Sequence, residues 1–108
     1  MAYARKDLTA LNSTLEVDSP EEKNGTVSLQ YVSGGAGTVV VEGILSEAAA
    51  DNVDANWHIL TLTKTDNTAV ASLAAAGIGY AENYYARVRA RKSVGAASCI
   101  VVLGVTYG

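Results

Sequence analysis

The stretch Tyr84-Tyr85-Ala86-Arg87-Val88-Arg89-Ala90-Arg91-Lys92 decides the fold class. Its apolar residues recur at every second position and alternate with Tyr85 and three arginines. A period of two is that of a β-strand with one face on the core and a polar face outward. The segment is therefore predicted to be a half-buried antiparallel strand with a cationic face.

Two further strands are predicted upstream. Residues 26–32 alternate, with Val27, Leu29 and Tyr31 on one face, and residues 38–45 form a strongly β-branched run. The glycine-rich stretch between them is typical of a turn, so the two strands are predicted to form a hairpin. Gly43 indicates a bulge or the close approach of another chain.

The remaining predicted strands are residues 57–63, 68–73, a segment with Ile78 and Tyr80, and 98–107. The last is nearly continuous in apolar residues, which predicts burial on both faces. Cys99 within it is expected to behave as a small buried hydrophobe. Trp57 is predicted to anchor the core, because the chain has no Phe.

These segments predict an all-β fold: a single antiparallel β-sandwich or jelly-roll-like domain of six to eight short strands over residues 26–108. Residues 1–25 are predicted to form an extended N-terminal arm and a turn. Within them, residues 1–18 are read either as an arm or as a first strand. Leu8, Leu11 and Leu15 fit helical spacing, whereas Leu15 and Val17 fit a strand.

Composition excludes several classes of protein. The chain has 108 residues, a net charge of −3 and one Cys, which rules out an internal disulfide and argues against a phosphate-neutralising nucleic-acid binder. We expect no signal peptide and no membrane span, since no apolar run is long enough. Of the 53 hydrophobic residues 18 are Ala. This thin core suggests that neighbouring molecules contribute stability.

No residue pattern indicates an enzyme. His58 is the single histidine, and no serine has the setting of a nucleophile. Asp51-Asn52-Val53-Asp54-Ala55-Asn56 carries oxygen ligands of the type that Ca²⁺ prefers, but lacks the glycine and the late glutamate of a calcium loop. It is interpreted as a polar turn. No catalytic residue, cofactor or metal is therefore predicted.

Several segments between Gly37 and Val105 together resemble a known family. They are Val41-Glu42-Gly43, Asn56-Trp57, Leu60-Thr61-Leu62-Thr63, Ala69-Val70-Ala71-Ser72-Leu73, Ala75-Ala76-Gly77-Ile78 and Tyr85-Ala86-Arg87-Val88-Arg89-Ala90. This layout is similar to small β-sandwich virion proteins of tailed bacteriophages, including head-decoration (cement) proteins. It covers about two thirds of the chain. The sequence departs from it in a longer stretch at 46–55 and in residues 1–25, which have no counterpart.

The resemblance implies a non-enzymatic protein on the capsid surface that is made in the host cytoplasm. It would bridge major capsid protein subunits as a homo-oligomer, with a trimer favoured and a dimer possible. It implies no direct contact with nucleic acid or membrane. The residues predicted to form the partner or oligomer interface are Leu8, Leu11, Leu15, Arg87, Arg89 and Arg91, the arginines because guanidinium groups suit interface carboxylates. The arginines are read alternatively as a solvated face.

An alternative function is a glycan-binding adhesion module associated with a phage tail or fibre. Sugar-binding faces use exposed aromatic side chains, and the candidates here are Trp57, Tyr80, Tyr84 and Tyr85. The polar stretch 46–56 is the second feature that favours this alternative.

Overall fold

The computed structural model describes residues 2–18, 25–34, 37–44, 56–83, 85, 87–95 and 98–107. These residues form ten strands and no α-helix. The strands are β1 (Ala2–Leu8), β2 (Thr14–Asp18), β3 (Gly25–Gly34), β4 (Thr38–Ile44), β5 (His58–Ile59), β6 (Leu62–Lys64), β7 (Ala69–Val70), β8 (Gly77–Asn83), β9 (Arg87–Val94) and β10 (Cys99–Tyr107). In this part of the chain, no helix has the length and apolar character needed to cross a membrane.

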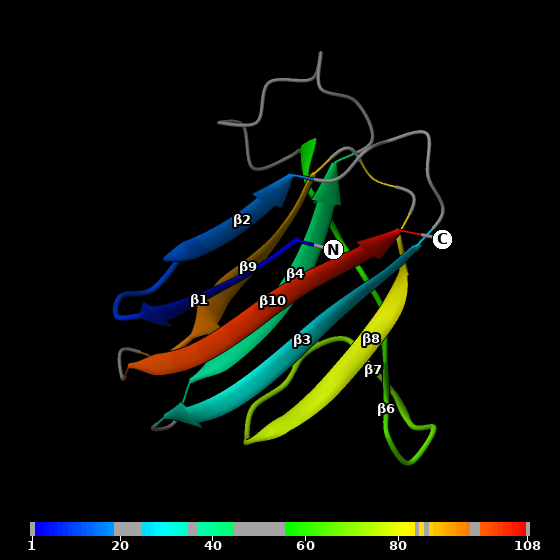
Figure 1. The fold of residues 1–108 in the computed structure, drawn as a ribbon. Coiled ribbons are helices and arrows are strands. Elements are labelled where there is room, and N and C mark those ends of the chain that lie inside the picture. Colours follow the sequence, from blue (N-terminus) through cyan, green and yellow to red (C-terminus); the bar gives the residue numbers. More distant parts are fainter. Residues whose placement is uncertain are drawn as a thin grey trace.

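The strands build two antiparallel sheets that pack face to face, as Figure 1 shows. One sheet has six strands in the order β1-β10-β3-β8-β6-β7, and the other has four in the order β2-β9-β4-β5. The predicted all-β sandwich is confirmed. Its strands are more numerous and several are shorter than predicted, because the chain repeatedly crosses from one sheet to the other.

The N-terminal segment is part of the sandwich, so of the two readings of residues 1–18 the structure supports the strand and not the separate arm. β1 pairs with β10 over seven residue pairs, and β2 pairs with β9 over five. Leu8 and Val17 belong to the core, and their burial is what holds both strands in place. Asn12, with φ of 67°, makes the tight turn between the two strands.

The predicted hairpin between β3 and β4 is also wrong, because the two strands lie in different sheets. β3 pairs with β10 and β8, whereas β4 pairs with β9 and β5. The link crosses the end of the sandwich at Gly37, whose carbonyl accepts a 3.0 Å hydrogen bond from the Tyr31 hydroxyl. A Cβ at Gly37 would collide with the Cys99 sulfur, so glycine is required for this crossing.

The predicted strand over residues 57–63 is divided into β5 and β6, again in different sheets. Leu60 and Leu62 are buried and Ile59 is exposed, whereas Trp57, at the start of the segment, is buried as well. The Leu60 amide donates a 2.8 Å hydrogen bond to the Val41 carbonyl as the chain crosses. This crossing positions the cleft described below.

The core lies between the sheets and consists mainly of Val and Leu side chains. Trp57 and Cys99 are buried, as predicted. β10 departs from its prediction of burial on both faces. Val101, Leu103 and Val105 are fully buried, whereas Ile100 and Val102 on the other face are only partly buried. No layer of described residues packs over that second face (Figure 1).

The free edge of β1 is charged. Lys6 is paired with the buried Val101, so its side chain leaves from the core side of the sheet. Its ammonium group donates a 2.9 Å hydrogen bond to the carbonyl of Thr14 in the opposite sheet. Arg5 and Asp7, on the outward side of the same strand, are exposed.

Candidate functional site

The outward side of the six-stranded sheet carries exposed apolar and aromatic side chains. Strand register places Tyr3, Gly104, Ser28 and Tyr80 in one row across four strands. Tyr3 is 71% exposed and Tyr80 is 42% exposed, and the small residues between them leave both rings standing above the sheet.

The next row crosses the same strands and contains Arg5, Val102, Gln30 and Ile78. Ile78 is 42% exposed, and Val102 is only partly buried. We use the name outer-sheet face for Tyr3, Ile78, Tyr80, Ile100 and Val102. Exposed apolar side chains gathered on one face are typical of protein interaction sites.

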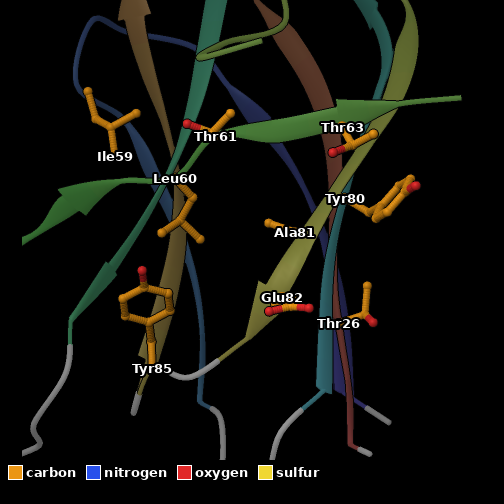
Figure 2. A pocket seen from close by; sticks show the side chains of 9 residues that line it. All are labelled: Thr26, Ile59, Leu60, Thr61, Thr63, Tyr80, Ala81, Glu82 and Tyr85. Carbon is orange, nitrogen blue, oxygen red and sulfur yellow. The ribbon is translucent and has the colours of Figure 1, made fainter. Parts of the chain in front are cut away.

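A cleft of about 670 Å³ adjoins this face at the end of β8. β6 pairs with β8 only at Thr63–Tyr80 and Lys64–Gly79, and the chain before β6 then turns away toward β4. The separation leaves an opening beside Ala81. The lining residues, drawn in Figure 2, are Thr26, Ile59, Leu60, Thr61, Thr63, Tyr80, Ala81, Glu82 and Tyr85.

The cleft combines apolar and polar groups. Figure 2 shows the Tyr80 ring on one side, the Tyr85 ring on the other, and Ala81 and Glu82 between them in that view. The Tyr85 ring packs on Gly43, where a Cβ would come within 2.5 Å of the ring. Gly43 therefore does mark a close approach, and what approaches is a side chain of the same molecule.

The arginine face of β9 is organised by Glu42 of β4. Arg89 Nε donates to Glu42 Oε1 at 2.8 Å, and Arg91 Nε donates to the same oxygen at 3.0 Å. Arg91 also donates to Asn12 Oδ1 at 2.9 Å. The Arg89 guanidinium lies 4.3 Å from the centre of the Trp57 ring, in cation–π geometry. Both arginines thus have partners within the molecule.

The low exposure of this cluster distinguishes it from a charged face in contact with solvent. The side chains of Arg89 and Glu42 are 8% and 6% exposed. Removal of one charge from such an enclosed pair is costly, because the other charge stays buried. Arg87, the third arginine of the predicted interface, is partly buried at the start of β9.

The predicted leucines of the N-terminal segment have different environments. Leu8 is fully buried, and Leu15 packs against the core. Leu11 is 56% exposed and lies in the turn between β1 and β2. Of the three, only Leu11 offers a largely exposed side chain to a partner.

The aromatic residues that the sequence suggested for sugar binding also differ in burial. Trp57 is buried, whereas Tyr80 and Tyr85 line the cleft. Tyr84 and residues 51–55 lie outside the described residues. Within the described ranges, no group of three or more His, Cys, Asp or Glu side chains could hold a metal ion.

Sequence reasoning missed two features of the site. Glu42 lies in a β-branched run, and nothing local to that run reveals that two arginines lie across from it. A signal did exist for the outer-sheet face, because the nearly continuous apolar pattern of β10 exceeds what one buried face requires.

The comparisons with known proteins give a likeness of fold. No protein-family model matches the sequence, and no curated protein matches it. Among solved structures, the SPBc2 prophage-derived protein YomS is similar, with a TM-score of 0.59 and 11% sequence identity. The likeness covers 98% of this chain and 96% of that one. The sandwich, including its N-terminal strands, is therefore a fold that a prophage-derived protein also has.

Proposed function

We propose that this protein is a structural protein of a bacteriophage particle, and specifically a capsid decoration (cement) protein. It binds the outer surface of the head and stabilises the head by bridging major capsid protein subunits. The single observation that carries the proposal is the outer-sheet face. β10 has the nearly continuous apolar pattern of a strand that is buried on both faces, yet the described residues cover only one of its faces. A partner protein would cover the other face.

Two further observations support the proposal. The fold is shared over nearly the whole chain with a prophage-derived protein. The buried charges of Glu42 and Arg89 bind each other within the molecule, so no ligand is needed to bury them. The sequence resemblance to phage virion proteins points in the same direction.

The partner surface in this proposal differs from the one that the sequence suggested. Arg89 and Arg91 already bind Glu42, so the outer-sheet face takes the place of the arginines as the docking surface. The N-terminal segment still contributes through Tyr3 of β1. Leu11 lies outside this face, in the turn after β1.

The test is binding of the purified protein to expanded capsids that lack it, followed by sedimentation. We expect binding at micromolar concentration, and loss of binding in Ile78→Lys, which places a charge on the outer-sheet face. Val94→Lys is the matched control, since Val94 is an exposed aliphatic residue of β9 in the other sheet. Absence of binding by the unaltered protein, or equal loss in both variants, contradicts the proposal.

Self-association is the second part of the proposal. Light scattering of the purified chain is expected to give a homo-oligomer, with a trimer favoured because it suits local three-fold positions of a capsid. A strict monomer at all concentrations contradicts this part and leaves capsid binding to be judged by the sedimentation experiment.

A glycan-binding module associated with a tail or fibre is the second candidate function. The observation that favours it is the cleft, which brings exposed Tyr80 together with threonine hydroxyls and the Glu82 carboxylate.

A further inference from the structure

We propose that the cleft between β6 and β8 binds a neutral carbohydrate, with the Tyr80 ring as the stacking surface and Thr61 and Thr63 as hydrogen-bonding groups. The inference deepens the second candidate function by naming a site and a class of sugar. It does not depend on binding to capsids.

The size and shape of the cleft suit a short sugar chain. Ligand sites for small molecules have volumes of roughly 300–1,000 Å³, and the cleft measures about 670 Å³. The residues that line it, labelled in Figure 2, include members of β3, β6 and β8. The volume thus suits a small saccharide.

The side chains match the two kinds of surface that a sugar presents. One face of a pyranose carries C–H groups, which pack on an aromatic ring or an aliphatic side chain. Tyr80 is 42% exposed and Ile59 is 53% exposed, so both have apolar area available at the cleft. The hydroxyls of a sugar need donors and acceptors, and a threonine hydroxyl is both. Thr61 is exposed and Thr63 is partly exposed.

The strand geometry explains why these groups converge. Thr63 is the direct cross-strand partner of Tyr80, so their side chains lie on the same face of the sheet. Thr61 and Ile59 precede β6 on the segment that crosses toward β4. The crossing therefore brings an apolar and a polar side chain to the side of the cleft opposite β8.

Charge narrows the class of sugar. Among the described residues that line the cleft there is no lysine or arginine, so a sialylated, sulfated or phosphorylated sugar would meet no counter-ion there. The net charge of the protein is −3, which disfavours anionic sugars further. A neutral hexose or N-acetylhexosamine meets no such penalty. Its hydroxyl groups can donate to and accept from the hydroxyls of Thr61 and Thr63.

The test is a glycan array that carries neutral hexose and N-acetylhexosamine oligomers beside their sialylated and sulfated counterparts. The full chain is expected to bind neutral members and to leave the anionic ones unbound. The best neutral oligomer on the array is then titrated by calorimetry. Tyr80→Ala is expected to weaken binding at least tenfold, and Thr61→Arg, which fills the cleft from an exposed position, to abolish it.

Tyr3→Ala is the matched control, because Tyr3 is an exposed tyrosine in the same row of the same sheet but outside the cleft. It is expected to bind the sugar as the unaltered protein does, and all variants are expected to keep the same thermal midpoint. The inference is overturned by an array without neutral hits, by a preference for anionic glycans, or by equal loss in Tyr3→Ala and Tyr80→Ala. Since Thr61 lies outside the outer-sheet face, capsid binding by Thr61→Arg separates this inference from the proposed function.

Discussion

Replacing Glu42 with glutamine tests whether the buried charge cluster stabilises the pairing of β4 and β9 in the four-stranded sheet. The carboxylate accepts hydrogen bonds from Arg89 at 2.8 Å and from Arg91 at 3.0 Å. The neutral amide of Glu42→Gln removes the negative charge that lies 2.8 Å from the Arg89 guanidinium, which stays buried beside Trp57. Removal of one partner of a buried ion pair costs about 3–5 kcal/mol. Because glutamine keeps an acceptor, we expect a loss near the lower end, about 3 kcal/mol.

That loss is large compared with the stability of a domain of this size, which is about 5–15 kcal/mol. Each kcal/mol shifts the midpoint of thermal unfolding by about 4–8 °C in a small domain, so the midpoint should fall by about 12 °C or more. Urea unfolding followed by tryptophan fluorescence gives the free energy directly, and Trp57 lies against the cluster.

Glu16→Gln is the matched control for this experiment. Glu16 is the cross-strand partner of Arg89 on its other side, in β2, but it is exposed. Its replacement is expected to change the free energy of unfolding by less than about 0.5 kcal/mol. If Glu42→Gln costs no more than Glu16→Gln, the buried pair does not stabilise the fold and the reasoning is refuted.

Three further predictions follow from packing and hydrogen bonding. Gly43→Ala places a methyl group 2.5 Å from the Tyr85 ring, so we expect a loss of about 1–3 kcal/mol in urea unfolding and a changed cleft; unchanged stability would contradict this packing. Burial and the neighbouring Cys99 raise the pKa of Tyr31 to about 12. Because a tyrosine in the unfolded chain ionises near pH 10, the free energy of unfolding should fall between pH 10 and 12. Tyr31→Phe should lack this part of the decrease in urea unfolding followed over pH. Asn67 has φ of 68°, a left-handed conformation that a β-branched residue rarely adopts. Asn67→Val should therefore lower the free energy of unfolding by about 1–2 kcal/mol, whereas Asn67→Gly should leave it nearly unchanged in thermal unfolding. Equal effects of the two variants would argue against this backbone strain.

Local sequence pattern predicted the strands better than it predicted their partners. The alternation in residues 26–32 reflects which side chains face the core, and the structure confirms that Val27, Leu29 and Tyr31 are buried. Pairing depends on where the chain crosses between sheets. Gly37 permits such a crossing through its contact with Cys99, a residue 62 positions away, and no local pattern encodes that contact.

The arginine face of β9 illustrates the same limit for the candidate site. Alternation correctly predicts that Arg89 and Arg91 point away from the core, yet it cannot tell a solvated face from an ion-paired one. The difference depends on Glu42, brought opposite them by pairing of β4 with β9. For residues 1–18 the strand reading is the one that the structure supports, with two strands in place of one.

The charged edge of β1 limits how copies of this protein can assemble. An uncapped edge strand invites open-ended polymerisation, in which each new copy extends the sheet of the last. Lys6 leaves the core side of β1 and spans to the Thr14 carbonyl, so its ammonium group occupies the flank that an incoming strand would approach. The edge therefore disfavours filaments that would grow by strand addition at β1.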